Sequence, residues 1–569
     1  MAQSETFDVV VVGSGAGGLL SAIRAVDLGL SAIVLEKSDR YGGTSAVSGG
    51  AIWIPNNDAI ADIDSPRDAL AYLKAVTKDA VPEAKLIRYV DVSPRLLRYL
   101  RSLGVDYYVH PQLSYPDYYP GAPGALPRGR NMFVRPMDGA ALGEEFFRLR
   151  ESYPEFKLLG RMSLDLEEAG VIGGFYPGWR RAVAKVVAGY WGDVAWRRRT
   201  RRDRRLTIGN ALVGGLRAAM LKRAVPLRLK TALTRLDYDG GRVTGVTALH
   251  EGRELHFRAA QGVVLATGGF EQSQDLRLRY LDQATEAQWS ATPRDNNAGD
   301  ALRAAEAIGA DTAFLNEAWW APTVSMPARA TPNTVRNVAL FFERGFPHCL
   351  AVNRLGKRFV NEICSYHQFG QAMLRDNAET GANLPCWLVF DAQYRSKYPL
   401  GGLLPGRVEP DAKLPPDWFD NFLYRAGDIR TLAGKIGLAP DVLAATVDRF
   451  NGYARRGVDD EFGKGGNVYN QFFGDPRNGP SPVLGAVERP PFYAVRLDLG
   501  DIGTKGGPKT NEDAAVLDLE GRPIPGLYAI GNAAGSVMGG AYPGAGATLG
   551  SAMTFGYVAA TRLAQVNEW

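Results

Sequence analysis

The N-terminal part of the chain alternates between short apolar runs and glycine-rich or polar turns. Residues 7–12 form an apolar run rich in valine, which is typical of a buried strand. Glycine, serine and alanine fill positions 13–18, and an apolar pattern with helical spacing then continues to Leu28. A second apolar run at 32–35 ends at Glu36. The pattern predicts a strand, a glycine turn, a helix and a second strand that ends in an acid.

This order of elements is the one that binds a dinucleotide. Gly13 allows the tight turn, Gly15 lets the backbone approach a pyrophosphate, and Gly18 lets the helix pack on the sheet. Glu36 can accept a hydrogen bond from a ribose hydroxyl. A glycine-rich turn without a ligand is the alternative. The strands on both sides and the acid in its place favour dinucleotide binding.

Two later apolar segments extend the same architecture. Residues 263–270 have the composition of a buried parallel strand followed by a glycine turn. An apolar run at 527–534 leads into a glycine-rich turn at 544–550 and a helical pattern. The uncharged stretch 523–561 is long enough to cross a bilayer, but its glycines and turn signals argue against a spanning helix.

Residues 178–196 have the pattern of an amphipathic helix, with apolar side chains at three- and four-residue steps and basic residues off that stripe. The stripe consists of Trp179, Val183, Val186, Val187, Tyr190 and Val194, and the arginine-rich run 197–205 follows it. We expect 175–205 to attach to an anionic membrane surface, because tryptophan, tyrosine and arginine suit the headgroup region. A core-packed helix with a solvated loop is one alternative. A nucleic-acid patch is another, and we expect no nucleic-acid partner because no nucleic-acid fold motif is present.

Composition adds that the basic charge is local. The chain has 569 residues, 46% hydrophobic and 22% charged, which predicts a globular protein of two or three domains. The net charge is only +5, although residues 180–205 carry ten basic and two acidic side chains. The three cysteines lack metal-ligand spacing, so we expect neither a disulfide framework nor a metal site. Acidic residues near the N-terminus argue against a signal peptide, and we expect a cytoplasmic protein.

The loop after the second strand indicates which dinucleotide binds. Residues 41–50, YGGTSAVSGG, resemble the flavin-contacting loop of the fumarate reductase and ketosteroid dehydrogenase superfamily. The resemblance implies FAD rather than NAD. It implies noncovalent binding, because this loop lacks the histidine through which succinate dehydrogenases attach their flavin. The implied FAD-binding residues are Gly13, Gly15, Gly18, Glu36, Lys37, Gly43, Thr44, Ser45, Gly49, Gly50, Gly268, Gly531, Asn532, Thr548 and Leu549.

Four further segments resemble one branch of this superfamily, the 3-ketosteroid Δ1-dehydrogenases. The segments are PDYYP at 116–120, EAWW at 317–320, Tyr366 after the Asn361-Glu362 motif, and YPGAG at 542–546. Fumarate reductases place a catalytic arginine where Tyr366 stands. Tyrosine suits a neutral ketone better than a dicarboxylate, so the exchange favours a 3-ketosteroid. Trp319 and Trp320 are expected to line an apolar steroid pocket.

The resemblance also implies a role for each tyrosine. Tyr366 is the base that takes the proton from carbon 2, and Tyr118 lies beside it and passes the proton to solvent. Tyr119 is the alternative to Tyr118. The hydroxyl of Tyr542 and the backbone amide of Gly546 bind the ketone oxygen, and each helps most as that oxygen becomes enolate-like. His367 is expected to be structural, with its side chain turned away from the site if the local backbone is extended.

The fold implied is α/β, with a Rossmann-like FAD-binding domain of the GR2 type, an inserted α+β capping domain and the basic amphipathic insertion. The expected boundaries give the FAD-binding domain residues 1–290 and 488–569, and the capping domain residues 291–487. The expected substrates are 3-keto-4-ene steroids, including cholest-4-en-3-one, in steroid or sterol degradation at the inner face of the cell membrane. A 5α-3-ketosteroid Δ4-dehydrogenase, a fumarate-reductase-like enzyme and a flavin-bearing membrane-binding module stay open as alternatives, and so does the electron acceptor.

Overall fold

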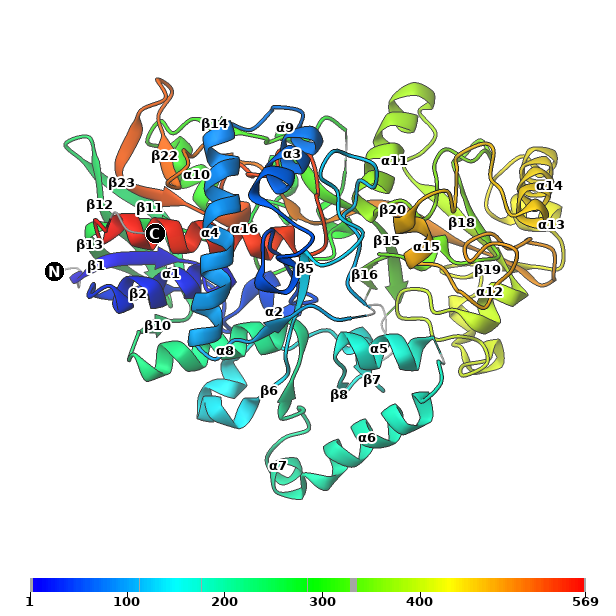
Figure 1. Cartoon of the computed structure of the whole chain (residues 1–569), viewed down its shortest axis with the longest axis horizontal. Coiled ribbons are helices and arrows are strands. Elements are labelled where there is room, and N and C mark those ends of the chain that lie inside the picture. The colour runs from blue at the N-terminus through cyan, green and yellow to red at the C-terminus, as the bar shows by residue number, and fades with distance from the viewer. Residues whose placement is uncertain (1–3, 112, 175, 284, 328–334, 567–569) are drawn as a thin grey trace. The chain divides into compact units, whose positions relative to one another are not determined.

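The computed structural model describes residues 4–111, 113–174, 176–283, 285–327 and 335–566. Its contacts divide the chain into two compact units (Figure 1). The first unit comprises Met1–Leu281, Thr292–Ala318 and Gly503–Trp569, and the second comprises Asp282–Ala291 and Trp319–Ile502. The second unit ends later than residue 487 because strand β20 (Phe492–Thr504) belongs to its sheet.

A mixed eight-stranded sheet forms the centre of the first unit. Its parallel part runs in the order β10 (Leu227–Arg228), β2 (Ala32–Leu35), β1 (Ser4–Val12), β13 (Arg253–Leu265) and β23 (Pro523–Ala529). The antiparallel strands β12 (Arg242–His250), β11 (Thr231–Asp239) and β22 (Ala515–Leu517) complete it. Within β1, Val9 pairs with Ala32 on one side and with Gly262 on the other. A strand between two neighbours and two covered faces needs an unbroken apolar run, which Val9 to Val12 supply.

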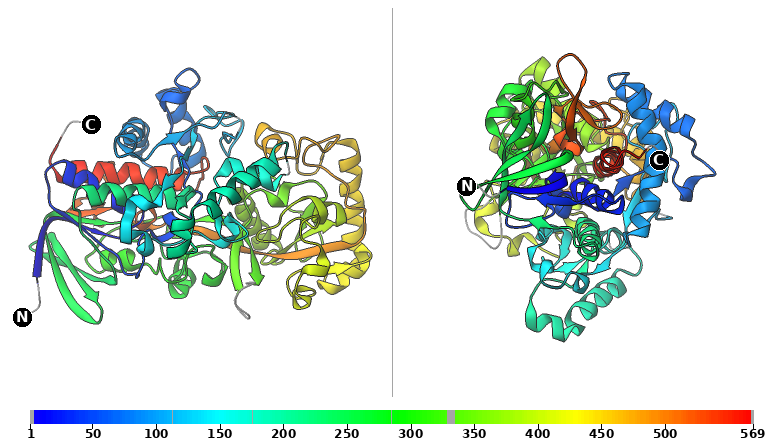
Figure 2. Two further views of the ribbon diagram at one scale, coloured as in Figure 1. Left: turned by 90° about the horizontal axis from the view of Figure 1, so that it is seen from below. Right: turned by 90° about the vertical axis from the view of Figure 1, so that its left-hand side faces the viewer.

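Both faces of the parallel strands are covered. On one face α1 (Ala16–Asp27) lies between α16 (Ala547–Leu563) and α8 (Ile208–Lys222) (Figures 1 and 2). On the other face, side chains of β1 share a hydrophobic core with residues of β11, β12 and β13 and with the alanines of α10 (Asp300–Glu306), which packs on β11. Since successive side chains of a strand point to opposite faces, Val10 and Val12 lie in this shared core while Val9 and Val11 face α1.

The second unit is built on a six-stranded sheet. Its strands follow the order β16 (Val335–Ala339), β15 (Ala318–Pro327), β20, β18 (Cys386–Asp391) and β17 (Cys349–Val352), and β19 (Tyr424–Ala426) also pairs with β20. Two helices, α13 (Ile429–Lys435) and α14 (Pro440–Arg456), pack on β17, β18 and β20 to form the core. A third helix, α11 (Tyr366–Thr380), begins at the capping residue Ser365 and ends at Gly381 in the left-handed conformation.

The amphipathic segment of the first unit forms two helices, α6 (Trp179–Gly192) and α7 (Val194–Arg199), instead of one. The break is at Asp193, whose side chain accepts a hydrogen bond from the Trp196 amide and so starts a new helix. The apolar stripe packs against protein, because Val186 and Tyr190 are buried with Met162 of β8 (Met162–Ser163). The expectation that Tyr190 faces lipid is therefore wrong.

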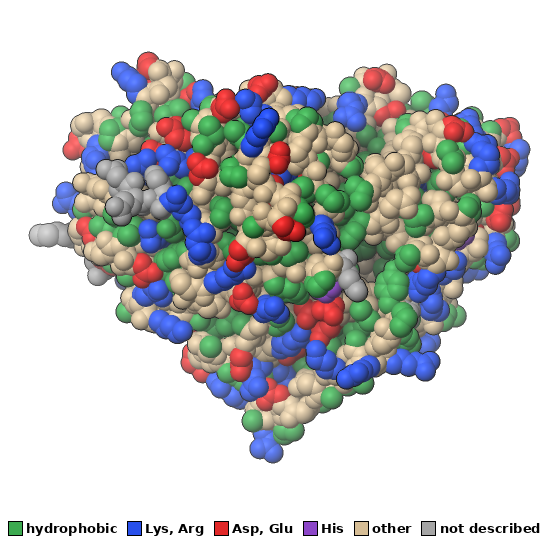
Figure 3. All heavy atoms as spheres, in the orientation of Figure 1, with side chains coloured by type: hydrophobic (Ala, Val, Ile, Leu, Met, Phe, Trp, Pro, Cys, Tyr) green, Lys and Arg blue, Asp and Glu red, His purple; other side chains and the backbone are tan. Residues whose placement is uncertain are grey.

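The arginine run after α6 is partly used inside the fold. Arg205 pairs with Asp165 and Glu168 at 2.7 and 2.6 Å, and Arg202 lies 4.6 Å from the centre of the Phe146 ring. Trp196 is buried as well, and its indole nitrogen donates to the Arg202 carbonyl, so this tryptophan does not face lipid either. Lys and Arg side chains nevertheless gather on the surface over α6 and α7 (Figure 3). Within the described part of the chain, no helix is long and apolar enough to cross a membrane.

Candidate functional site

The glycine turn after β1 has the geometry that the sequence predicts. Gly13 has φ +111°, and an added Cβ would overlap the Ala266 carbonyl. A Cβ on Gly18 would overlap the Gly13 carbonyl, so α1 can lie this close to the turn only with glycine there. Gly15 differs, because a Cβ on it would meet only the Ser45 hydroxyl, at 3.4 Å. The protein itself does not require glycine at 15, which leaves the space above Gly15 for a ligand.

Glu36 directly follows β2, and its buried carboxylate is held on both oxygens. Its Oε2 accepts from the hydroxyl and the amide of Ser14, and its Oε1 accepts from the Ser38 amide at 2.9 Å. The next residue, Lys37, points to Asp300 and pairs with it at 2.8 Å. Glu36 is therefore oriented beside the glycine turn, while the ammonium group of Lys37 is bound by a protein carboxylate.

The loop that resembles a flavin-contacting loop forms a short helix, α2 (Gly43–Val47), and the turn after it. The Ser45 hydroxyl accepts from the Ala16 amide at 3.1 Å, which joins α2 to the first turn of α1. A Cβ on Gly50 would lie 2.5 Å from the Ile208 carbonyl carbon, whereas a Cβ on Gly49 would meet nothing within 4 Å. Gly50 is thus required by packing, and Gly49 faces open space.

A network that sequence reasoning missed lies next to this loop. Asn297 donates to the Thr44 hydroxyl at 2.8 Å and to the buried Glu271 carboxylate at 2.7 Å. Glu271 also accepts from the Thr504 amide at 3.2 Å, and a Cβ on Gly268 would overlap the Asn297 side chain. No local pattern around Asn297 points to this network, because Thr44, Glu271 and Thr504 lie far from it along the chain.

These features fit an FAD cofactor. The buried side-chain oxygen of Asn296 accepts no hydrogen bond from any described residue, and its amide nitrogen would lie 3.9 Å from a Cβ on Gly43. The open space at Gly15 and Gly49 borders the same turn and loop. An unsatisfied buried polar atom beside glycine-lined space is the arrangement expected where a polar cofactor binds.

The C-terminal turn supplies a second part of the site. Gly531 and Asn532 lie in the short helix η8 (Gly531–Ala533), and Thr548 and Leu549 lie in the first turn of α16. Gly546 caps α16 with φ +95°, and its Cβ would come within 2.6 Å of the Ala51 carbonyl group. The first turn of α16 contains no acidic residue, so the positive end of its helix dipole is not neutralised there.

Tyr542 and Tyr118 are brought together in the first unit. Both rings are buried, with centroids 5.2 Å apart and planes tilted by 59°. The Tyr118 amide donates to the Pro543 carbonyl at 2.9 Å. The neighbouring Tyr119 instead accepts from the Tyr542 amide at 3.3 Å through its hydroxyl. Tyr118 is thus the residue of this pair whose ring faces the ring of Tyr542.

A buried ion cluster holds the loop that carries Tyr118. Asp117 accepts from the Trp53 indole, from Arg130 and from the Leu126 amide, at 2.8 to 2.9 Å. Burial raises the pKa of Asp117 to about 6, although Arg130 and these donors oppose the shift. Arg130 also pairs with buried Asp64 at 2.6 Å. Three charged side chains therefore fix the backbone directly before Tyr118.

Tyr366 lies in the second unit as the first residue of α11. Its buried ring packs edge-on against Phe341, with centroids 5.0 Å apart. His367 was expected to turn its side chain away from the site if the local backbone was extended. That condition does not hold, because its backbone is helical, and its side chain is fully buried. Trp320 lies against the same helix, since a Cβ on Gly370 would come within 2.6 Å of the Trp320 Cβ.

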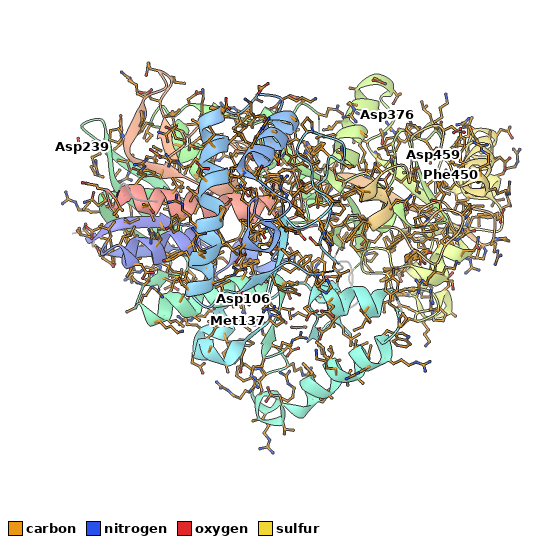
Figure 4. All side chains as sticks on the ribbon, viewed as in Figure 1. Asp106, Met137, Asp239, Asp376, Phe450 and Asp459 are labelled. Carbon is orange, nitrogen blue, oxygen red and sulfur yellow. The ribbon has the colours of Figure 1, made fainter. Side chains whose placement is uncertain are left out.

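The Asn361-Glu362 motif before Tyr366 is an anchor inside the second unit. Glu362 pairs with Arg358 at 2.8 Å, and Arg358 also pairs with Asp459 at 2.8 Å. Phe450 of α14 lies 5.1 Å from the same guanidinium (Figure 4). Burial works against ionisation of Glu362, but Arg358 and Lys464 hold its pKa below the ordinary value. The carboxylate that the motif supplies thus stabilises the segment leading into α11.

Comparison with known proteins gives a consistent result. A family model described as an FAD binding domain matches residues 8–549. The chain is 37% identical to a 3-oxosteroid 1-dehydrogenase from Mycolicibacterium smegmatis, over 98% of this chain and 97% of that protein. It is also 37% identical to a 4-oxocyclohexanecarboxylate 2-dehydrogenase from Sinomonas cyclohexanicum, over 98% and 93%.

A solved structure agrees with these relatives. It is the crystal structure of 3-ketosteroid Δ1-dehydrogenase from Sterolibacterium denitrificans in complex with 1,4-androstadiene-3,17-dione. Its sequence is 46% identical, the TM-score is 0.94, and the match covers 98% of this chain and 99% of the other.

Proposed function

Because this chain belongs to the 3-oxosteroid 1-dehydrogenase family of FAD-binding proteins, we propose that it removes hydrogen from carbons 1 and 2 of 3-keto-4-ene steroids. The observation that carries the proposal is the full-length match, at 46% identity, to a Δ1-dehydrogenase solved with a steroid-1,4-diene. The relative named for 4-oxocyclohexanecarboxylate makes a smaller cyclic ketone the second candidate. Both candidates are neutral ketones at the reacting ring, for which a tyrosine base and an oxygen-binding site would act together with the flavin as hydride acceptor.

FAD would be held noncovalently by a Rossmann-like, GR2-type arrangement of the first unit. The glycine turn at Gly13 and Gly15 would take the pyrophosphate, and Glu36 a ribose hydroxyl. The loop from Gly43 to Gly50 and the first turn of α16 would contact the flavin. When bound, the flavin supplies a two-electron acceptor for the hydride that leaves carbon 1.

The ketone oxygen would be bound by the Tyr542 hydroxyl and the Gly546 amide. Gly546 stands at the N-terminus of the 17-residue helix α16, where the helix dipole favours negative charge. As carbon 2 loses its proton, negative charge develops on this oxygen. A donor pair at a helix N-terminus is therefore most effective at the moment when proton abstraction needs it.

Tyr366 would accept the proton from carbon 2. An unperturbed tyrosine has a pKa near 10, so roughly one in a thousand is ionised at pH 7. The position of Tyr366 suggests one source of help, because it is the first residue of the 15-residue helix α11, whose first turn has no acidic side chain. The positive end of that helix favours a phenolate over a phenol. Tyr118 would pass the proton on to solvent.

Substrate tests separate the candidates. Purified enzyme would be assayed with an artificial dye and, in turn, cholest-4-en-3-one, a 5α-3-ketosteroid, 4-oxocyclohexanecarboxylate and fumarate. Dye reduction with the 3-keto-4-ene steroid and formation of the 1,4-diene are expected. A preference for the 5α-steroid would indicate the Δ4 activity, and no turnover of any ketosteroid would refute the proposal.

A paired substitution tests the base. Tyr366→Phe should lower kcat about 10²–10⁴-fold while the protein stays yellow, because only the proton acceptor is lost. Tyr453→Phe, on α14 in the same unit, is the matched control and should retain activity. If Tyr366→Phe turned over at the rate of the control, the base would be another group.

The helices α6 and α7 would attach the enzyme to the inner face of the cell membrane, where sterol substrates partition. The residues that support this are at the break between the helices, where Trp191 is 57% exposed and Val194 is 55% exposed. The arginines exposed on the same segment are Arg180, Arg181, Arg198, Arg199 and Arg201. An apolar tip among arginines suits an anionic lipid surface.

Vesicle sedimentation tests the attachment. The enzyme should sediment with vesicles containing phosphatidylserine and much less with vesicles of phosphatidylcholine alone. The double variant Trp191→Ala, Val194→Ser should lose this binding, whereas Leu278→Ser, which changes an exposed apolar residue of helix α9 (Gln274–Tyr280), should keep it. Equal sedimentation of both variants would count against α6 and α7 as the attachment site.

A further inference from the structure

The segment 540–546, which carries Tyr542 and Gly546, is held by donors from other parts of the first unit. The Pro543 carbonyl accepts from the Tyr72 hydroxyl at 2.6 Å and from the Tyr118 amide, and the Ala545 carbonyl accepts from Asn131 at 2.8 Å. Three of the seven residues are glycine, so the segment has little conformational preference of its own. Its shape therefore depends on these outside contacts.

On the other side of Tyr542, the Ala541 carbonyl is bound by a buried lysine. Lys505 donates from Nζ to this carbonyl at 2.6 Å. The Lys505 backbone is fixed at both ends, because its amide donates to the Glu317 carbonyl at 2.9 Å and its carbonyl accepts from the Ser536 amide at 3.1 Å. The ammonium group thus extends from a fixed strand end and hydrogen-bonds the carbonyl of the residue directly before Tyr542.

Glu317 acts on the same stretch of backbone. A Cβ on Gly540 would lie 2.8 Å from the Glu317 carboxylate, so this side chain rests against Gly540. Burial lowers the pKa of Lys505 to about 7, and the negative charge of Glu317 opposes that shift. The Glu317 carboxylate favours the charged form of Lys505. Because a hydrogen bond from a charged donor is about twice as strong as a neutral one, the carboxylate strengthens the hydrogen bond from Lys505 to the Ala541 carbonyl.

We propose that Lys505 and Glu317 are positioning residues for Tyr542, which fix the Gly540-Ala541 backbone so that the tyrosine hydroxyl meets the ketone oxygen of the substrate. The inference rests on the proposed function, since it assigns Tyr542 to that oxygen. Neither residue needs to touch the steroid. A shift of about 1 Å in an oxygen-binding donor can lower the rate roughly a hundredfold. Losing the hydrogen bond from Lys505 to the Ala541 carbonyl should therefore have a large effect on the rate.

The chain offers a matched control for this lysine. Lys85, on helix α4 (Glu83–Ser102), is also fully buried, and burial likewise lowers its pKa to about 7. Its ammonium group donates to the Thr510 hydroxyl and to the Gly535 carbonyl, not to the segment 540–546. Replacing either lysine by methionine removes one buried ammonium group of the same kind. Only one of the two replacements releases Ala541.

The test compares kcat, KM and FAD content of Lys505→Met and Lys85→Met with those of the wild-type holoenzyme on a 3-keto-4-ene steroid. Lys505→Met should lower kcat roughly 10- to 100-fold with a much smaller change in KM, because Tyr542 contributes most as charge develops on the ketone oxygen. Lys85→Met should keep kcat. Lys505→Gln, whose amide can still donate, should recover part of the loss.

If Lys505→Met does not fold, the double variant Lys505→Met, Glu317→Gln replaces it, because removing both charges leaves no unpaired charge in the interior. Its kcat should fall in the same way. Wild-type kcat in Lys505→Met or in the double variant, or an equal loss in Lys85→Met, would overturn the positioning role while the dehydrogenase activity stands. A wild-type enzyme that turns over no ketosteroid would overturn the proposed function and this role with it.

Discussion

Replacing Gly13 or Gly15 by alanine adds the same methyl group at two nearly adjacent positions, but the surroundings of the two differ. At Gly13 the added carbon would overlap the Ala266 carbonyl in a backbone with φ +111°. The left-handed conformation costs a non-glycine residue roughly 1–2 kcal/mol, and overpacking adds about 1–3 kcal/mol. Gly13→Ala should therefore destabilise the protein without FAD by about 2–5 kcal/mol.

At Gly15 the protein tolerates the same methyl group. The backbone is extended there, with φ −65° and ψ 170°, and the nearest atom is the Ser45 hydroxyl at 3.4 Å. The stability without FAD should change by no more than about 0.5 kcal/mol. The methyl group would instead occupy the space that the pyrophosphate needs, so FAD affinity should fall at least about tenfold, or about 1.4 kcal/mol.

Two measurements separate the variants. Thermal unfolding of the FAD-free protein reports the fold, and titration with FAD followed by flavin fluorescence reports the cofactor site. Gly13→Ala should fail the first test, and Gly15→Ala should pass the first and fail the second. Wild-type FAD affinity in Gly15→Ala, or a loss of stability equal to that of Gly13→Ala, would refute the assignment of the open space to the cofactor.

Three further predictions concern other parts of the molecule. Tyr542→Phe should lower kcat about 10²–10³-fold, and Tyr119→Phe should lower it much less; equal losses would contradict the ketone contact. Glu362→Gln should destabilise the protein by about 3–5 kcal/mol in chemical denaturation, because it leaves buried charge uncompensated, whereas the partly exposed Glu461→Gln should have little effect. The pKa of Lys85 is lowered to about 7 by burial, so between pH 7 and 10 the unfolded chain binds the extra proton. Stability should then rise with pH by up to about 1.4 kcal/mol per unit, and Lys85→Met should lose this slope in thermal unfolding of the FAD-loaded enzyme. Parallel curves would contradict the shift.

Much of the first unit could be predicted from local sequence. The valines of β1 and the glycines at 13 and 18 are determined by neighbours along the chain and by the backbone conformation of one turn. Long-range contacts could not be predicted in this way. Nothing near Asn297 in the sequence indicates that it binds Glu271 and Thr44, because the three residues meet only when distant strand ends come together.

The direction in which side chains point was the second feature that could not be predicted from the sequence. The periodicity at 178–196 indicated helix, but it could not tell whether the apolar stripe faced lipid or Met162. It also did not reveal that Asp193 would begin a second helix. The choice between Tyr118 and Tyr119 was open for the same reason, since adjacent residues differ only in where their rings point. In the structure the ring of Tyr118 packs against the ring of Tyr542, whereas Tyr119 accepts from the Tyr542 amide through its hydroxyl.

The arginine run after α6 contains two kinds of residue, those whose side chains make contacts within the fold and those whose side chains are exposed. Arg202 and Arg205 hold Phe146, Asp165 and Glu168 together, so the fold needs them in any environment. Arg198 and Arg201 are exposed, and the proposed anionic lipid surface would be their partner. A related enzyme that does not bind a membrane would thus keep Arg202 and Arg205, whereas other residues could replace Arg198 and Arg201. The residues found at these positions in related enzymes would therefore indicate whether membrane attachment has been under selection.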